Sequence, residues 1–163
     1  MMTSQTQIQR TLTKLTGLKP WGVKLGFGTF VTIEFGKPQA SVQHRGAEHG
    51  EWHLWLYMCA WRFQTADRII VGSEDERSRI ESSLESLSLQ RLRSVRLLRP
   101  ALDLAIKFGA EHQLLTFSPS SVENEMQWIL YTPEGNSVAA FGDGTHKYGK
   151  SSEPLPAVRT QRR

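Results

Sequence analysis

The chain contains little cysteine and no long apolar run. Its one cysteine among 163 residues, Cys59, excludes an internal disulfide. No apolar run approaches the roughly 18 residues that a membrane-spanning helix requires. Residues 1–10 contain no apolar segment of the kind found in a secretory signal. A single thiol and the absence of an export signal favour a reducing compartment. We therefore expect a cytoplasmic protein that does not enter a membrane.

The common catalytic motifs are also missing. The sequence contains no G-x-x-x-x-G-K-[ST] phosphate-binding loop, no G-x-S-x-G nucleophile elbow and no H-E-x-x-H motif. Cys59 lies in an apolar run without an adjacent base, and burial makes a thiol unreactive. The sequence therefore predicts no cofactor and favours a protein without catalytic activity, although it does not settle whether the chain is an enzyme.

Length and composition predict one globular domain over residues 1–148. Residues 149–163 are rich in serine, proline, lysine and arginine, which predicts a basic, disordered tail. The net charge is +4, and three arginines lie within the last five residues. Since a short basic tail is usually only solvated, the overall charge gives little support to nucleic-acid binding.

Two segments of the chain resemble each other. Residues 23–35 and 104–117 each contain alternating apolar residues around a Phe-Gly pair, at Phe27-Gly28 and at Phe108-Gly109. Each is followed by a proline, a loop and an aromatic segment with the period of a β-strand. Glycine at these positions permits a tight turn. The pattern predicts two pseudo-repeated β units, each containing a hairpin.

Two amphipathic helices are expected. A short one covers residues 5–16, where three apolar residues are spaced four and three apart. The main helix covers about residues 74–88 and carries one apolar stripe. Ser73 and Glu76 have the S-x-x-E spacing of a capping box, in which each side chain satisfies a free backbone N–H at the helix start.

The remaining elements are predicted strands joined by short links. Residues 52–63 are apolar on both faces, which favours a central strand covered on both sides. The Thr-Pro-Glu-Gly-Asn turn at 132–136 predicts a final hairpin. Short links place neighbouring strands antiparallel. The fold class is therefore α+β: mainly antiparallel sheet of about eight strands, in one curved sheet or two, with one main helix and a short N-terminal one.

A group of histidines lies in the polar loop 37–50 and just after it. Imidazole and carboxylate are zinc ligands, and His44, Glu48 and His49 fall within this loop. However, no cysteine is near, and histidines in a polar loop are more often ordinary polar residues. We therefore predict no metal site here and assign His44 and His49 to a partner-binding surface.

His53 differs from the loop histidines because Trp52 and Leu54 flank it on an apolar strand. A half-buried imidazole needs a hydrogen-bond partner, and Glu34 or Asp103 supplies one if the strands are adjacent. An unrecognised catalytic site around these three polar residues remains as a third hypothesis.

Four arginines without any acidic neighbour lie between Ser86 and Leu102. They are Arg91, Arg93, Arg96 and Arg99. On a strand, such side chains can contact an acidic patch of a protein or the phosphates of a nucleic acid. We assign the four arginines to a partner-binding surface.

The stretch L-G-F-G-T-F-V-T-I-E-F-G (25–36) and G-E-W-H-L-W-L-Y-M-C-A-W-R-F (50–63) resembles small, uncharacterised bacterial proteins found beside toxin or defence genes. The resemblance implies a small protein-binding module, such as an immunity protein, an inhibitor or an accessory subunit, and transfers no functional residues. The alternative is a nucleic-acid-binding accessory protein that uses Arg91–Arg99 and the terminal arginines. The tryptophan-rich strands are also compatible with a homodimer.

Overall fold

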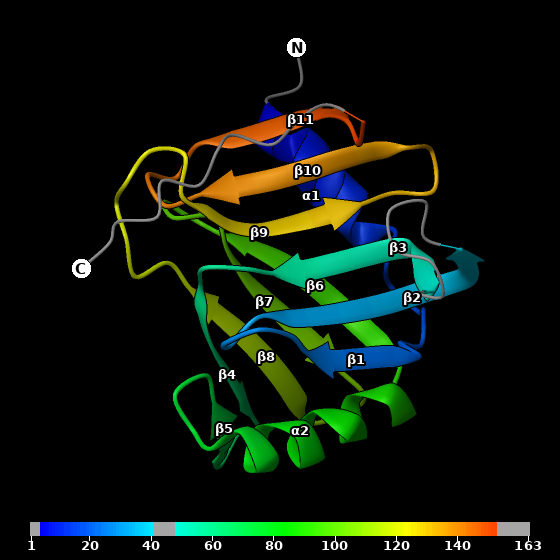
Figure 1. Cartoon of the computed structure of the whole chain (residues 1–163), viewed down its shortest axis with the longest axis vertical. Coiled ribbons are helices and arrows are strands. Elements are labelled where there is room, and N and C mark those ends of the chain that lie inside the picture. The colour runs from blue at the N-terminus through cyan, green and yellow to red at the C-terminus, as the bar shows by residue number, and fades with distance from the viewer. Residues whose placement is uncertain (1–3, 41–47, 153–163) are drawn as a thin grey trace.

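The computed structural model describes residues 4–40 and 48–152. It confirms the α+β class, because these residues form two α-helices and eleven strands in two antiparallel sheets. The two sheets pack face to face, and their strands cross at a steep angle (Figure 1).

The strands are arranged as follows. The six-stranded sheet has the order β1 (Gly22–Leu25), β2 (Val31–Ala40), β3 (Glu48–Leu56), β9 (Met126–Tyr131), β10 (Asn136–Phe141) and β11 (His146–Lys150). The five-stranded sheet has the order β5 (Ile69–Gly72), β4 (Ala60–Gln64), β8 (His112–Phe117), β7 (Asp103–Phe108) and β6 (Leu92–Leu98). Every strand pairing is antiparallel, as the short links predicted.

The expected count of about eight strands was too low, partly because residues 52–63 are not one central strand. The chain leaves β3 at Leu56 and enters β4 of the other sheet at Ala60. This segment is apolar because both strands contribute to the space between the sheets, β3 through Leu54 and Leu56 and β4 through Trp61 and Phe63. The strand β11 was also missed, and it includes Gly149 and Lys150, which the composition assigned to the tail.

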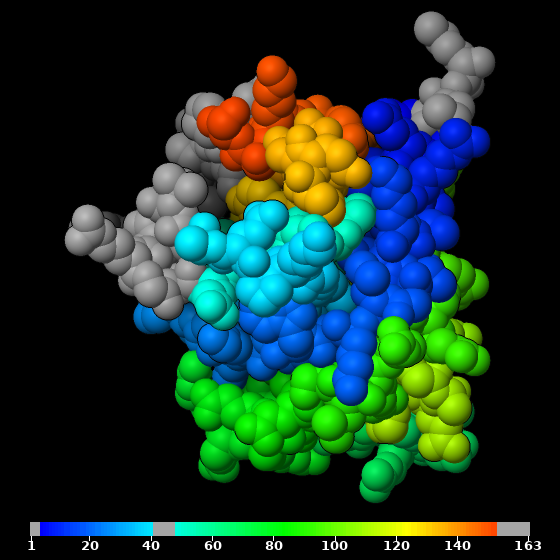
Figure 2. All heavy atoms as spheres, turned by 90° about the vertical axis from the view of Figure 1, so that its right-hand side faces the viewer, coloured from blue at the N-terminus to red at the C-terminus, as the bar shows by residue number. Residues whose placement is uncertain are grey.

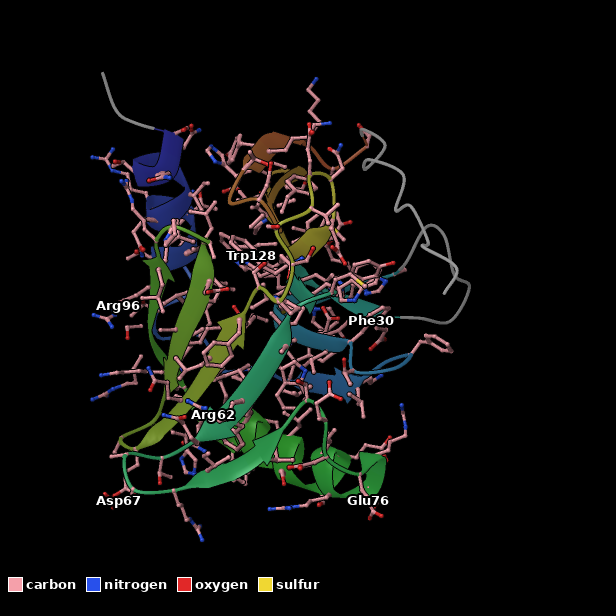
Figure 3. All side chains as sticks on the ribbon, turned by 90° about the vertical axis from the view of Figure 1, so that its left-hand side faces the viewer. Phe30, Arg62, Asp67, Glu76, Arg96 and Trp128 are labelled. Carbon is pink, nitrogen blue, oxygen red and sulfur yellow. The ribbon has the colours of Figure 1, made fainter. Side chains whose placement is uncertain are left out.

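One large apolar cluster fills the space between the sheets. Its largest fully buried side chains include Trp61 and Trp128. Figure 3 shows Trp128 lying between the two sheets. Both indole N–H groups donate hydrogen bonds to backbone carbonyls, that of Trp61 to Thr29 at 2.9 Å and that of Trp128 to Leu102 at 2.8 Å. Burial therefore leaves neither indole nitrogen without a partner.

The N-terminal helix α1 (Ser4–Thr13) packs beside the edge strand β6. The Gln9 side chain bonds this strand at two points, donating to the Val95 carbonyl at 2.7 Å and accepting from the Leu97 amide at 2.9 Å. An open strand edge invites pairing with another chain, and this contact satisfies part of it. In Figure 2, α1 (blue) lies along the side of the molecule.

The main helix α2 (Arg77–Glu85) continues into a 3₁₀ turn, η1 (Ser86–Leu89). The predicted capping box is wrong, because Glu76 is the N-cap residue and makes no side-chain capping bond. Ser73 instead accepts a hydrogen bond from the Trp61 amide at 3.1 Å. Ser73 directly follows β5 and lies beside β4. Its hydroxyl therefore accepts a hydrogen bond from the sheet and not, as the sequence predicted, from the helix.

Both predicted hairpins are present, with left-handed glycines at Gly28 (φ 61°) and Gly109 (φ 56°). The two β units nevertheless differ in their placement. In the first unit, β1, β2 and β3 all belong to the six-stranded sheet. In the second unit, β7 and β8 belong to the five-stranded sheet, whereas β9 pairs with β3 in the six-stranded sheet. Among the described residues, no helix is long and apolar enough to cross a membrane.

Candidate functional site

A row of polar and aromatic side chains crosses the outer face of the six-stranded sheet. Glu34 on β2 pairs with His53 on β3, and His53 pairs with Tyr131 on β9. Their neighbours Ile33 and Leu54 belong to the core between the sheets. Since side chains alternate along a strand, Glu34 and His53 lie on the opposite, outer face.

The Glu34 carboxylate is buried on this face, with 5% of the residue exposed. A buried carboxylate requires hydrogen-bond donors, and Glu34 has two. His53 Nδ1 lies 2.5 Å from Oε1, and the Gly50 amide donates to Oε2 at 2.7 Å. The predicted pairing of His53 with Glu34 is therefore confirmed.

Asp103, the other partner expected for His53, lies on the five-stranded sheet. Its carboxylate accepts a hydrogen bond from the Ser118 amide at 2.8 Å. Burial raises the pKa of Asp103, while this hydrogen bond acts in the opposite direction. Asp103 does not belong to the cluster around Glu34, so the structure does not assemble the three-residue catalytic site considered from the sequence.

A bulge between β2 and β3 brings His49 to the same place. The pairing shifts between Phe35 and Pro38, and Gly50 then faces Pro38. On a straight strand, His49 and His53 would lie about 13 Å apart. Their ring centroids are instead 4.9 Å apart. The bulge therefore bends the first residues of β3 so that the His49 side chain approaches His53 on the outer face. Bulges near functional sites commonly redirect a side chain in this way.

Gly50 makes this bend sterically feasible. A Cβ atom at residue 50 would lie 2.7 Å from both the Phe35 nitrogen and the Trp52 carbonyl oxygen, and it would also collide with the Phe35 carbonyl oxygen. All of these atoms are backbone and cannot move aside independently. Glycine is therefore required at the position whose amide also holds Glu34.

His49 completes a cluster that we call the Glu-His-His trio: Glu34, His49 and His53. One ligand atom from each residue lies within 4.8 Å of the other two. His49 Nδ1 is 3.6 Å from Glu34 Oε1, which is close enough for an ion pair but too long for a hydrogen bond. This buried nitrogen has no hydrogen-bond partner among the described residues.

Tyr131 forms one wall of the trio. Its ring centroid lies 5.7 Å from that of His53. Burial raises the pKa of the Tyr131 phenol, so the tyrosine is neutral at physiological pH and adds no charge to the trio. The result is a buried carboxylate with two imidazoles beside it, partly open to solvent through His49, whose side chain is 41% exposed.

A second feature of the outer face is a group of aromatic side chains, which we call the aromatic surface: Phe27, Phe30, Trp55 and Tyr57. Phe30 contacts Trp55 on β3 and Tyr57 just after β3. The ring centroids are 6.3 Å and 4.4 Å apart, respectively. Phe27 lies 6.5 Å from Phe30 and is 89% exposed. An exposed aromatic ring that continues into a group of neighbouring rings is typical of a binding surface.

The hairpin that carries Phe27 is fixed in place. The Gly26 amide donates to the Phe30 carbonyl at 2.7 Å. The Arg77 guanidinium of α2 donates to the carbonyls of Gly26 and Leu25 at 2.9 and 3.0 Å. The hairpin is therefore tied to the main helix, and Phe27 is presented from an ordered tip.

The predicted arginines lie on another part of the molecule. Arg91, Arg93, Arg96 and Arg99 are all exposed, along β6 or beside it. Among the described residues none of them forms an ion pair with a carboxylate, although Arg91 donates to the Gly17 carbonyl at 2.8 Å. Figure 3 shows Arg96 and Phe30 on opposite sides of the molecule. His49 lies on β3 of the six-stranded sheet, whereas β6 belongs to the other sheet. His44 lies outside the described residues.

Cys59, the single thiol, lies between β3 and β4 and is 3% exposed. Burial raises the pKa of the thiol to about 12. A thiol in this state is a poor nucleophile at neutral pH, in agreement with the structural role expected from the sequence.

Sequence reasoning expected the contact of His53 with Glu34 but missed the place of His49 in the trio and the whole aromatic surface. Glu34 lies 19 positions before His53, so no local motif connects them. A usable signal was present in His-Gly-x-x-His at 49–53, because a glycine inside a strand often marks a bulge. Comparison of the chain with protein-family models, with curated proteins and with solved structures finds no match.

Proposed function

We propose that the chain is a small cytoplasmic protein-binding module of the immunity, inhibitor or accessory-subunit kind, without catalytic activity of its own. The observation that carries the proposal is the exposure of Phe27 at the tip of a tethered hairpin, beside three further aromatic rings. Aromatic side chains dominate the binding energy of protein interfaces.

The rigidity of the hairpin supports the same proposal. Ordering a loop on binding costs free energy, and a surface that is already ordered avoids this cost. The contacts of Arg77 with the hairpin provide such order. The sequence assigned the arginines and His49 to the partner surface. The geometry instead supports a partner surface centred on Phe27 and the neighbouring aromatic rings.

The proposal predicts that Phe27→Ala weakens binding of the partner by at least about 30-fold, the effect of losing a hot-spot residue worth about 2 kcal/mol. The partner is first captured from the native host with the wild-type chain and identified by mass spectrometry. Affinity is then measured with purified components by calorimetry. Because Phe27 is almost fully exposed, its replacement leaves the fold intact.

Ile69→Ala provides the matched control. Ile69 is also a large exposed apolar residue, at 60%, but it lies on β5 of the other sheet. The control variant is expected to bind as the wild type does. Equal affinities for wild type, Phe27→Ala and Ile69→Ala would contradict the proposal. If only a dimer of this chain is recovered from the native host, the result would also contradict binding of a separate protein partner.

The second candidate function is nucleic-acid binding, which the exposed arginines of β6 favour. Since Arg91 is engaged with Gly17, the informative variant replaces Arg93, Arg96 and Arg99 by alanine. If the three arginines contact phosphates, the slope of log K against log salt concentration changes by about 3. The triple variant is expected to lose binding to DNA or RNA at low salt.

A control of equal charge separates this result from a general charge effect. Lys24 and Lys37 on β1 and β2, and Arg68 in the link before β5, are exposed and lie away from β6 in the sequence. Their triple replacement by alanine should leave binding unchanged. Absence of any binding of the wild type to DNA and RNA at low salt would exclude this candidate function.

A further inference from the structure

We propose that the Glu-His-His trio is a binding site for a divalent transition-metal ion of the zinc class. The proposal is independent of the protein-binding function. It assigns a ligand to Glu34, His49 and His53 on the basis of their chemistry, their spacing and an unsatisfied buried nitrogen.

The donor set is suited to zinc. Two imidazole nitrogens and one carboxylate oxygen are ligands that Zn²⁺ binds at about 2.0–2.2 Å. Oxygen-preferring cations such as Ca²⁺ and Mg²⁺ do not favour imidazole. Glu34 Oε1 faces both histidines, while Oε2 is occupied by the Gly50 amide at 2.7 Å. This hydrogen bond orients the carboxylate in the manner of an outer-shell contact at a metal centre.

The spacing of the donor atoms is also suitable. Two ligands of a tetrahedral zinc ion lie about 3.3 Å apart, given the usual bond lengths. His49 Nδ1 and Glu34 Oε1 are 3.6 Å apart, which is close to this value. His53 Nδ1 and Glu34 Oε1 are closer, at 2.5 Å. The ion would replace the proton between these two groups, and a small separation of the two side chains would admit it.

The buried His49 nitrogen gives the strongest support. A buried polar atom without a partner is rare in folded proteins, and an ion is one of the few explanations. His49 Nδ1 is such an atom within the described part of the chain, and it lies 3.6 Å from Glu34 Oε1. A hydrogen bond explains the approach of His53 to the buried glutamate, but none explains the approach of His49. An ion shared by all three residues explains both.

The site depends on the backbone bulge between β2 and β3. His49 reaches the other two ligands only because the chain turns at Gly50. Three protein ligands leave one tetrahedral position for a ligand from outside the trio. The 41% exposure of His49 gives an ion access to the site from solvent.

The test is calorimetric titration of the full-length, metal-free protein with ZnCl₂ alone, followed by titration with CoCl₂ and recording of the visible absorption spectrum. The wild type is expected to bind one ion and to give the intense visible bands of four-coordinate Co²⁺. His49→Ala is the main variant, because His49 is partly exposed and its replacement leaves the core unchanged. We expect this variant to bind zinc at least about 100-fold more weakly, more than the loss usual for an outer-shell residue.

Glu34→Gln is the second variant, since it keeps the shape of the side chain and removes its charge, and it should weaken zinc binding to a similar extent. His146→Ala is the control, because His146 is a half-buried histidine on β11 outside the trio. Failure of the wild type to bind Zn²⁺ would overturn the proposal. Equal zinc affinity of wild type, His49→Ala and Glu34→Gln would also overturn it, by locating the ion elsewhere.

Discussion

Replacing Trp128 by alanine should destabilise the protein by about 3–5 kcal/mol, the range found for buried large aromatic residues. Trp128 is 1% exposed and lies between the two sheets (Figure 3). It belongs to β9, which crosses from the second β unit to pair with β3. Loss of the indole opens a cavity where the two sheets meet. Urea denaturation followed by circular dichroism measures the change.

The Trp128→Phe variant distinguishes the cost of the cavity from the cost of the lost hydrogen bond. Phenylalanine keeps most of the ring volume but cannot donate to the buried Leu102 carbonyl, which the indole contacts at 2.8 Å. An unsatisfied buried carbonyl costs about 1–3 kcal/mol. The phenylalanine variant should therefore lie between the wild type and Trp128→Ala. A loss below about 1 kcal/mol for Trp128→Ala would show that the sheets do not depend on this contact.

The second large effect is expected for Gly50→Ala. The added methyl group would collide with the backbone of Phe35 and Trp52, and overpacking of this kind typically costs about 1–3 kcal/mol. Movement of residue 50 also breaks the hydrogen bond from its amide to the buried Glu34 carboxylate, and a bond to a charged group contributes about 1.5–3 kcal/mol. We expect a total loss of about 4 kcal/mol in the free energy of unfolding.

Gly72→Ala is the matched control for this substitution. Gly72 is also a strand glycine, but the nearest atom to its added Cβ is 3.8 Å away, an ordinary contact. Its replacement should change stability by less than about 0.5 kcal/mol. Equal stabilities of the two variants in urea would contradict the assigned role of Gly50 in the bulge.

The sequence predicted the elements that depend on local patterns. Both helices, both Phe-Gly hairpins and the turn at 132–136 are present. Apolar alternation also identified buried residues of β2, such as Val31 and Ile33, and of β7, such as Leu104 and Ile106. The capping box failed because the Ser73 hydroxyl accepts a hydrogen bond from the Trp61 amide of the sheet and makes no capping bond to the helix. Propensity rules cannot weigh a tertiary contact against a local one.

The sequence could not show which strands become neighbours. Residues 52–63 look like one strand because a change of sheet leaves the apolar pattern unbroken. The trio requires β2 and β3 to pair with a bulge, which sets the distance between Glu34 and His49. The contact between Glu34 and His53 was foreseen because a half-buried histidine needs a partner. The bend at Gly50, which adds His49, was not predicted, although a glycine inside a strand can mark a bulge.

Site-specific photo-cross-linking in the native host tests the central proposal, that a protein partner binds the aromatic surface, most directly. A photoreactive phenylalanine derivative is placed at residue 27 and, in a separate variant, at residue 69, since both side chains are exposed. The account predicts a discrete cross-link to one other protein from residue 27 and none from residue 69. A cross-link from residue 69 alone, or none from residue 27, would contradict it.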